Sequence, residues 1–513
     1  MRNRISSLLL IIAFTVISFI GIRFYDYIFN YERARKYLFN PASKFNPNRL
    51  SNVQIKTTTE QPTNLSSDFG ALNRQSVRLV RELHSLITNP MLKPDEMHSL
   101  HDIATLMLET RLDLMDEISG QSESRRHRLL NLSQRLHEQL HRLQTPPNCD
   151  TAQFITTTFP SYCGFGCHAH HMAYVLSVGL ALNRTLFIVG DLWKDIFIPI
   201  TSCPNPLLRS TQRRRQTIKW GMSRHVMSRF NPPTLPSEWA AALEGLHGNP
   251  FAWFRGQLLA FILRIKDEAF KWRLVSQINA MRSQTPSGSL ACPVAGIHVR
   301  RTDKIQLNEA VFHNLAEYMS QVQRFFQRKL MEYQLRTNGN VSPSWTKRKR
   351  VFLASDDPLV FEEARRSYPD YEFIGDENRA TSAYDHSVGA TLGIFTDVQM
   401  LASTDFLSCT MSSNICRMAY EYMLADNRMN SDSSLRVESV DVMYFNVGER
   451  KRWWRALVDY PPLNISRDDR VSPIENEESY FLKVQWSQND RTTEQNLPTF
   501  LFEEEVLRIA DRD

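Results

Sequence analysis

The sequence predicts an α/β fold, and three of its features lead to that prediction. Short apolar runs that end in polar or charged residues, typical of buried strands, recur at residues 185–189, 295–299, 351–355 and 405–410. Amphipathic helical patterns separate them, and strands that alternate with helices are typical of parallel sheets. At 513 residues, with 42% apolar and 23% charged residues, the chain has room for two or three domains with full cores.

The first part of the chain is predicted to be a membrane anchor followed by a linker. Residues 5–22 are uncharged and mostly apolar, which is just long enough for a helix that spans a bilayer behind a tail of residues 1–4. A cleaved signal peptide is the alternative, but no small-residue cleavage site follows the run. Basic residues on both sides leave its orientation open. Residues 23–74 are rich in Pro, Thr, Ser and Asn and predict a stem linker.

Residues 75–146 are predicted to be helical, as a coiled-coil-like stem. Between Arg, His, Glu and Gln residues, leucines recur at spacings of three and four: Leu129, Leu132, Leu136, Leu140 and Leu143. Because a helix with one apolar stripe must bury it, two arrangements are open. The stripe packs on the following domain, or it joins two copies of the chain. We expect the second, a homodimer through the helical stem.

The cysteines indicate an oxidising compartment. Cys163 and Cys167 flank one short loop and Cys409 and Cys416 another, and both spacings suit local disulfides. Zinc is the alternative because histidines lie beside Cys167, but no second closely spaced pair completes a site, so we expect no metal. Three glycosylation sequons agree with a lumenal chain: Asn64, Asn131 and Asn464. Together with the anchor, these features predict a single-pass membrane protein with a lumenal domain.

Polar groups follow the predicted strands, at the edge where α/β sheets bind their ligands. Arg300 and Arg301 come directly after residues 295–299, and a guanidinium group matches phosphate oxygens in a bidentate manner. The alternative is a strand end with surface salt bridges. Two glycines, Gly164 and Gly166, lie in a loop before a predicted helix, where bare backbone can approach a phosphate.

Two further groups of polar residues follow strands. Asp356 and Asp357 could bind ribose hydroxyls, cap the next helix, or do both, and the cap is the expected default. The run C-T-M-S-S-N-I-C-R at residues 409–417 sets hydroxyls and amides at a helix start, which favours an anion. The basic runs at 213–215 and 347–350 lack interleaved aromatic residues, so we expect no nucleic-acid partner.

From about residue 149 to residue 444, a series of motifs resembles the core α1,6-fucosyltransferases of N-glycan processing in order and spacing. The motifs are C-G-F-G-C-x-x-H-H, H-G-N-P, H-V-R-R-T-D-K followed by E-A-x-F-H, L-A-S-D-D-P, Y-E-F-I-G-D and D-F-L-S-C-T-x-S-S-x-x-C-R-x-A-Y-E. The H-x-R-R-x-D element is shared with other fucosyltransferases, whereas the first and last motifs are far more specific. The chain is identified as a divergent member of this family.

The resemblance implies a two-lobed GT-B-like nucleotide-sugar transferase, with a catalytic domain at 149–445 and a small SH3-like β module at 457–510. Its reaction would be inverting transfer of L-fucose from GDP-β-L-fucose to the 6-hydroxyl of the innermost Asn-linked GlcNAc of an N-glycoprotein. No cofactor or metal is expected, because Arg300 would supply the positive charge at the departing GDP. The implied location is the Golgi membrane, single-pass type II, with the catalytic domain in the lumen.

The resemblance also assigns roles to residues by their positions in the motifs. Glu309 matches the base that deprotonates the acceptor hydroxyl and Lys304 matches its partner, with Asp356 and Asp357 nearby in the active site. Arg300 would contact the β-phosphate. The other implied donor contacts are His298 and Asp397, at guanine and ribose, and Arg301, Ser413, Gly164, Phe165 and Gly166. The implied disulfides are Cys163–Cys167, Cys149–Cys203 and Cys409–Cys416, with Cys292 free.

The chain departs from the family pattern at three places, one of which is a missing disulfide, because Val175 and a residue near Thr157 stand where cysteines are usual. Between Lys304 and Glu309 it has I-Q-L-N, one residue longer than the family's V-G-T and without its glycine. The C-terminal module lacks the family's G-x-Y-P-S-Y and W-D-G elements and has no glycine after Gly448. Two alternatives are therefore open: a GDP-fucose-dependent transferase with another acceptor position, or a non-catalytic glycan-binding paralogue. Intact Arg300, Asp303, Lys304, Glu309 and Asp397 argue against the second.

Overall fold

The computed structural model describes the chain from residue 119 onward, with gaps. The described residues are 119–159, 164–206, 215–217, 235–282, 293–302, 311–337, 342–380, 387–425, 436–441, 444, 454–471, 481–488, 491–498, 502–504 and 508–509. The predicted tail, anchor and linker, and the stem before residue 119, lie outside them. Among the described helices, none combines the length and the apolar character needed to cross a membrane.

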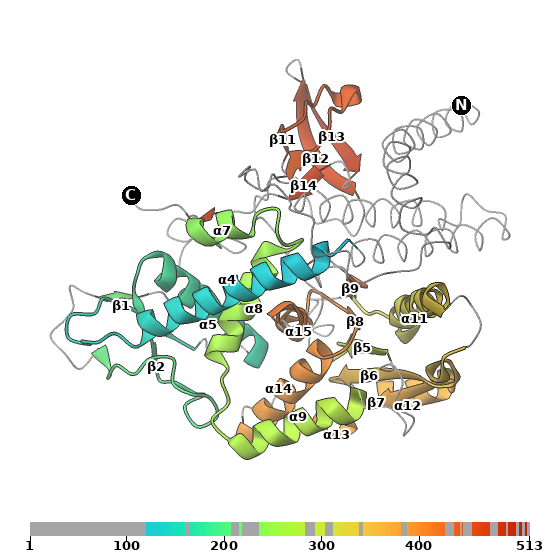
Figure 1. Ribbon diagram of the computed structural model, residues 1–513, viewed down its shortest axis with the longest axis horizontal. Coiled ribbons are helices and arrows are strands. Elements are labelled where there is room, and N and C mark those ends of the chain that lie inside the picture. Colours follow the sequence, from blue (N-terminus) through green and yellow to red (C-terminus); the bar gives the residue numbers. More distant parts are fainter. Residues whose placement is uncertain are drawn as a thin grey trace, which may run out of the picture. The chain divides into compact units, whose positions relative to one another are not determined.

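Five parallel strands form the largest sheet, in the order β7-β6-β5-β8-β9 (Figure 1). They are β5 (Val294–Val299), β6 (Lys349–Ser355), β7 (Tyr371–Ile374), β8 (Phe406–Cys409) and β9 (Val437–Ser439). The sequence predicted β5, β6 and β8. All six residues of β5 are buried, because the strand is central and both of its faces are covered.

Two long helices cover the two faces of β5. Ala295, Ile297 and Val299 share one core with α11 (Leu315–Thr337). On the other face, a Cβ at Gly296 would lie 3.3 Å from Leu401 of α14 (Val388–Ala402). Further helices complete this half of the fold: α9 (Glu268–Arg282), the 3₁₀ helix η5 (Ser344–Lys347), α12 (Leu359–Ser367), α13 (Glu377–Ala380) and α15 (Asn414–Ala425).

A second parallel sheet has three strands in the order β2-β1-β3. They are β1 (Phe154–Thr158), β2 (Thr185–Val189) and β3 (Arg215–Thr217), of which the sequence predicted β2. The neighbouring elements are α5 (Phe165–Ala181), β4 (Leu235–Pro236), α7 (Ser237–Leu243) and α8 (Pro250–Ile262). Asn249 caps α8 by accepting the Ala252 N–H at 3.1 Å, and Pro250 occupies the first helical position. Two parallel sheets with intervening helices confirm the predicted α/β class.

Helix α8 and helix α15 are in direct backbone contact. A Cβ added at Gly256 of α8 would lie only 2.0 Å from the carbonyl oxygen of Glu421 of α15. No side chain fits there, so glycine at residue 256 allows the two helices to touch. This contact joins a helix that precedes the five-stranded sheet in the chain to the helix that follows β8.

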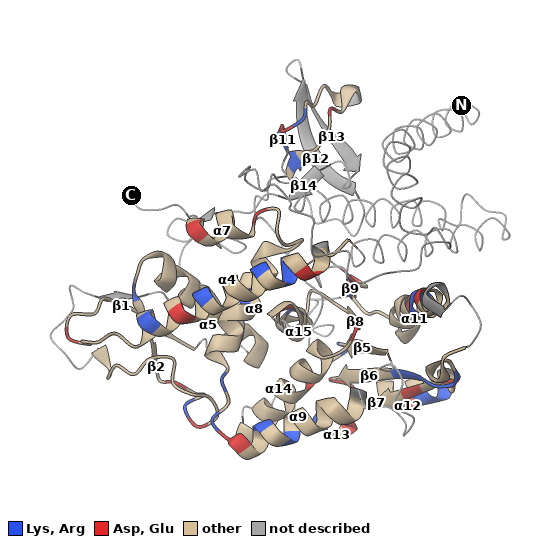
Figure 2. Ribbon diagram, in the orientation of Figure 1, with Lys and Arg blue, Asp and Glu red and all other residues tan. Residues whose placement is uncertain are grey.

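The leucine stripe of α4 (Gln121–Gln144) is buried within this chain. Four leucines belong to the same hydrophobic core as α5 and α8: Leu129, Leu132, Leu136 and Leu140. Polar contacts support this packing, since Ser133 and His137 both bond to the Gln257 side chain of α8, at 2.7 and 3.1 Å. The packed-helix alternative therefore holds for these four leucines, and a homodimer through the rest of the stem stays a prediction. Acidic and basic residues mix along the rest of α4 (Figure 2).

The C-terminal segment is β-rich from residue 454, slightly before the predicted start at 457. β10 (Trp454–Ala456) pairs antiparallel with β11 (Arg470–Val471) and β14 (Phe502–Glu504), β12 (Phe481–Gln488) pairs with β13 (Arg491–Pro498), and β15 (Arg508–Ile509) pairs with β4. A 3₁₀ turn, η7 (Pro461–Leu463), follows β10. Asn464 and Asp468 have φ of 54° and 72°, so Asn and Asp form left-handed turns where glycine is absent.

Candidate active site

The site is centred on the ends of β5 and β6, where Arg300 and Asp356 meet. Arg300 Nη1 lies 3.0 Å from Asp356 Oδ2, and the Asp356 side chain is only 3% exposed. Asp356 also accepts the backbone N–H groups of Arg301 and Thr302, at 2.8 and 3.0 Å, and the Thr302 hydroxyl. Burial would raise the pKa of Asp356, but Arg300 and these donors outweigh it and lower the pKa. Asp356 is therefore an ionised anchor that holds the chain leaving β5.

His298 lies beside this ion pair as a neutral, buried imidazole. Burial, followed by the nearby Arg300 charge, lowers the pKa of His298 to about 4, although Asp356 opposes the change. Its Nδ1 atom is buried and has no hydrogen-bond partner among the residues that the structure describes. An uncharged ring nitrogen next to a guanidinium is suited to a hydrogen bond with a polar, partly anionic ligand.

Arg301, an expected donor contact, has partners different from those of Arg300. Its Nη1 lies 2.6 Å from Glu363 of α12 and 4.0 Å from Asp357, and its guanidinium stacks 4.9 Å from the Phe312 ring. Consecutive residues of an extended segment point to opposite faces of the sheet, so the two arginines cannot share one ligand easily. In this structure Arg301 holds α12 through Glu363, and its role in donor binding stays a prediction.

The two adjacent aspartates also have different partners. Asp357 accepts the N–H of Leu359, the first residue of α12, at 3.0 Å, while its own N–H donates to Ser355 Oγ. The predicted capping role is confirmed for Asp357. Asp356 instead faces Arg300, so only one of the two expected active-site carboxylates contacts the cationic centre.

Two helix N-termini meet at the next part of the site. Gly164 precedes α5, and a Cβ at Gly166 would approach Asn414 Cβ, at the start of α15, to 2.8 Å. His170 Nδ1 and Asn414 Oδ1 add a contact of 3.0 Å between the same helices. The glycine at 166 is therefore needed for this close packing, while a Cβ at Gly164 would have no atom within 4 Å among the described residues. The first turn of a helix presents backbone N–H groups of a kind that suits an anion.

Phe165, an expected donor contact, is the first residue of α5. Its ring is buried, 5.4 Å from Trp193 and 6.3 Å from Phe197 between ring centroids. The side chain belongs to an aromatic core cluster that fixes the start of α5. Only its backbone remains for a ligand.

Ser413 is buried in the turn between β8 and α15. Its N–H donates to the Thr410 carbonyl at 3.0 Å, and its carbonyl accepts the Arg417 N–H at 3.1 Å. The predicted Cys409–Cys416 disulfide joins the end of β8 to the first turn of α15 and so closes this turn covalently. The residue expected at the phosphates is thus held in a rigid connection.

A buried polar network behind this turn was not predicted. Glu421 of α15 is fully buried and accepts from His170 Nε2 at 2.8 Å and from the Tyr444 hydroxyl at 2.5 Å. Burial lowers the pKa of His170 more than the Glu421 charge raises it. Arg255 and Arg417 interact electrostatically with the same carboxylate. The sequence signal was present in C-R-x-A-Y-E, where Arg417 and Glu421 share one face of a helix.

Asp397 lies on α14 and pairs with Arg379 of α13, at 3.1 Å between Oδ1 and Nη1. Burial raises the pKa of Asp397 to about 7, with Arg379 opposing the rise and Asp376 adding to it. The charges that shift the pKa of Asp397 are therefore those of Arg379 and Asp376, and not those of Arg300 or Asp356. Asp397 thus belongs to a polar group formed with Arg379 and Asp376, and none of the contacts given for the described residues joins it to Arg300.

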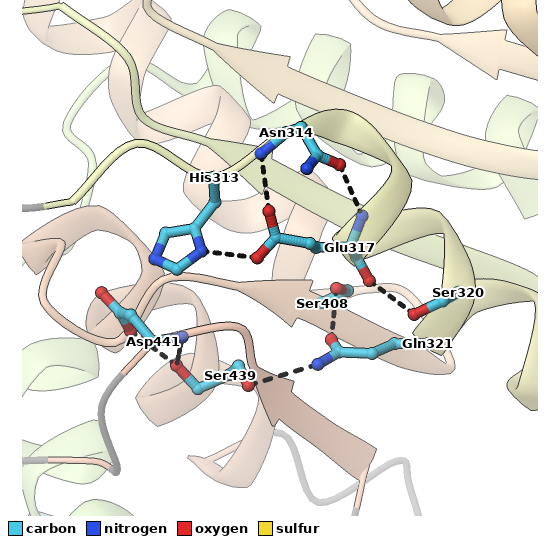
Figure 3. A network of polar contacts seen from close by, with 8 residues as sticks. All are labelled: His313, Asn314, Glu317, Ser320, Gln321, Ser408, Ser439 and Asp441. Atoms are coloured by element: carbon cyan, nitrogen blue, oxygen red, sulfur yellow. Dashed lines mark hydrogen bonds and ion pairs between the residues drawn. The ribbon is translucent and has the colours of Figure 1, made fainter. Parts of the chain in front are cut away.

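The start of α11 is fixed by a reciprocal capping arrangement (Figure 3). Asn314 accepts the Glu317 N–H at 3.2 Å, and Glu317 Oε1 accepts the Asn314 N–H at 2.9 Å. His313 Nδ1 lies 2.7 Å from Glu317 Oε2. The spacing Asn-x-x-Glu in the sequence is typical of such a capping arrangement. The expected base Glu309 and its partner Lys304 lie before this point, outside the described residues.

The cysteines follow the expected pairing where the structure describes them. Cys149–Cys203 is present as a disulfide, and Cys167 is disulfide-bonded, while its expected partner Cys163 and the free Cys292 lie outside the described residues. The histidines of the zinc alternative diverge, because His170 contacts Glu421 and His171 Nε2 contacts Thr157 at 2.8 Å. Among the described residues, no three metal-binding side chains gather at one point.

The chain belongs to the α1,6-fucosyltransferase family. It matches the family model described as alpha-(1,6)-fucosyltransferase N- and catalytic domains over residues 56–445. The alpha-(1,6)-fucosyltransferase of Drosophila melanogaster is 31% identical over 419 residues, which cover 77% of this chain and 64% of that protein. That of Caenorhabditis elegans is 26% identical over 385 residues, covering 69% and 65%. The matched region thus spans just under two thirds of these relatives.

Solved structures show weaker similarity. Arabidopsis thaliana FUT1 in complex with GDP is 13% identical, with a TM-score of 0.29, over 56% of this chain and 76% of that one. The fucosyltransferase NodZ from Bradyrhizobium is 15% identical, with a TM-score of 0.28, over 52% of this chain and 92% of that one.

Proposed function

We propose that this chain catalyses core α1,6-fucosylation, the transfer of L-fucose from GDP-β-L-fucose to the 6-hydroxyl of the innermost Asn-linked GlcNAc of an N-glycoprotein. Membership of the α1,6-fucosyltransferase family supports the reaction. The structural observation that carries it is the centre formed by Arg300, Asp356 and His298. A guanidinium held by one carboxylate, beside a neutral buried nitrogen, is arranged to bind a diphosphate.

In the proposed reaction, the acceptor oxygen attacks the anomeric carbon of fucose on the face opposite GDP. The bond from that carbon to the β-phosphate oxygen breaks, and its electron pair leaves with GDP. Glu309 takes the proton of the attacking hydroxyl and Lys304 supports that carboxylate. Arg300 stabilises the charge that develops on the departing diphosphate. Asp356 orients Arg300 and is not itself the base.

The rest of the donor site is proposed from two groups. Ser413 and the backbone at Gly164–Gly166 would contact the phosphates at the paired starts of α5 and α15. His298 and Asp397 would contact the nucleoside, with an ionised Asp397 accepting guanine N–H groups. No metal or other cofactor is required in this proposal, because Arg300 supplies positive charge at the leaving group.

The proposed protein has two lobes, a small C-terminal module and a membrane anchor. The two parallel sheets would form the lobes of a GT-B-like transferase, and the β-rich segment from residue 454 would be a divergent SH3-like module. Residues 5–22 would anchor the chain in the Golgi membrane as a single-pass type II protein. A homodimer would depend on stem residues before 119, since the later leucine stripe is buried.

A direct assay tests the reaction. The full-length chain in detergent would be incubated with GDP-fucose and N-glycopeptides of defined structure, and the product linkage mapped by NMR. Fucose on O6 of the Asn-linked GlcNAc is the expected result. Transfer to another position would establish the alternative acceptor, and GDP binding without transfer would establish a non-catalytic protein. Arg324→Lys, which alters an ion pair on α11, is the matched control for Arg300→Lys.

A further inference from the structure

Side chains from outside the turn hold the connection between β8 and α15. The N–H of Met411 donates to Ser439 Oγ at 3.1 Å, and the N–H of Ser412 donates to Asp441 Oδ2 at 3.3 Å. The carbonyl of Ser412 accepts from Arg417 Nη2 at 2.9 Å. An anionic and a cationic side chain therefore hold opposite sides of Ser412, the residue directly before Ser413.

The hydrogen-bond directions around Ser439 are fully determined (Figure 3). Its hydroxyl oxygen accepts the N–H groups of Met411 and Asp441, at 3.1 and 3.3 Å. Its single proton is then donated to Asp441 Oδ1, at 2.7 Å. Because Oδ2 accepts from Ser412, both oxygens of Asp441 act as acceptors. A carboxylate satisfies this pattern, whereas an amide would set its NH₂ group against one of the two donors.

Helix α11 fixes the position of this pair. Gln321 Nε2 donates to the Ser439 carbonyl at 3.2 Å, while its Oε1 accepts the hydroxyl of Ser408 in β8 at 2.5 Å (Figure 3). Arg324 and Glu438 add an ion pair of 2.6 Å between α11 and β9. Of these contacts at the end of β9, the Glu438 pair does not involve the turn, so it provides an internal control.

We propose that Asp441 is a positioning residue for the donor diphosphate, which acts through Ser412 to set the turn that carries Ser413. This inference rests on the proposed donor site but names a residue outside all of the family motifs in the sequence. The ligand that depends on it is a nucleoside diphosphate. Loss of the Oδ2 acceptor would release the Ser412 N–H, and loss of the Oδ1 acceptor would release the Ser439 hydroxyl that in turn holds the Met411 N–H. Either change would let Ser413 and the start of α15 move away from the phosphates.

The test measures GDP affinity by calorimetry and steady-state kinetics on the full-length chain. Asp441→Asn keeps the size of the side chain and removes one acceptor. We expect the Kd for GDP and the KM for GDP-fucose to rise about tenfold, with kcat within about threefold of wild type, since the turn contributes mainly to ground-state binding. The control Glu438→Gln should leave all three values within about twofold.

A double variant separates positioning from general stability. If Asp441 acts through the turn, Asp441→Asn should weaken GDP binding much less when Ser413→Ala is already present. Additive effects would overturn the inference, as would a Kd within twofold of wild type for folded Asp441→Asn, or an equal loss in Glu438→Gln. If Asp441→Asn does not fold, Ser439→Ala replaces it, with an expected rise in Kd of at least about threefold and the same criteria. A wild-type chain that binds no GDP would instead refute the proposed function.

Discussion

Replacing Arg300 by Lys tests the proposed centre most directly, because the change keeps the charge and removes the guanidinium geometry. One nitrogen of Arg300 pairs with Asp356, 3.0 Å away. A guanidinium group carries five N–H donors in a plane and can bind two phosphate oxygens at once, which an ammonium group cannot do with the same geometry. A lysine ammonium that remains with buried Asp356 cannot also reach a diphosphate in a bidentate manner. We expect kcat/KM to fall by at least about 100-fold, which corresponds to about 2.7 kcal/mol of transition-state stabilisation.

The fold should survive this change. Asp356 keeps the N–H groups of Arg301 and Thr302 and the Thr302 hydroxyl, so its buried charge stays hydrogen-bonded. Fucose transfer would be measured beside thermal unfolding, with Arg324→Lys as the control for loss of an arginine elsewhere in the same half of the fold. A folded Arg300→Lys chain that retains more than about a tenth of wild-type activity would refute the phosphate role.

Three further predictions concern the charges of the site. EDTA should leave fucose transfer nearly intact because Arg300 supplies positive charge; loss of activity with rescue by manganese would contradict this. Glu309→Gln should keep nearly normal GDP affinity in calorimetry while turnover falls by at least about 100-fold; if Glu309 only caps a helix, turnover per folded molecule will not change. Because the pKa of Asp397 is raised to about 7, the carboxylate becomes protonated as the pH falls through 7, and GDP affinity should fall with it. Calorimetry between about pH 5.5 and 8.5 would show this loss in wild type and not in Asp397→Asn.

Strand ends were predictable from the sequence, but the direction of each side chain was not. The run H-V-R-R placed two arginines just beyond the end of β5, where Arg300 pairs with Asp356 and Arg301 with Glu363. Adjacent Asp356 and Asp357 likewise have different partners. Because the point where a strand ends decides which residue faces the ligand, a shift of one residue exchanges the two roles.

Short strands and buried stripes were harder to predict for a different reason. β7 and β9 have four and three residues, too few for a periodic signal. The leucines of α4 show a clear helical stripe, but the pattern does not reveal whether the covering surface belongs to the same chain or to a second copy. Ser133 and His137 of α4 both bond to the Gln257 side chain of α8, and these polar contacts show that the covering surface belongs to the same chain.

The contact between α8 and α15 limits how the protein can admit its substrates. Gly256 lies against the Glu421 carbonyl, and the neighbouring His170, Glu421 and Tyr444 side chains are buried together. A hinge motion that separated these helices would hydrate a buried carboxylate network and break its hydrogen bonds, at a cost of several kcal/mol. We therefore expect α5, α8 and α15 to move as one rigid body, so that opening and closing of the site is left to its loops.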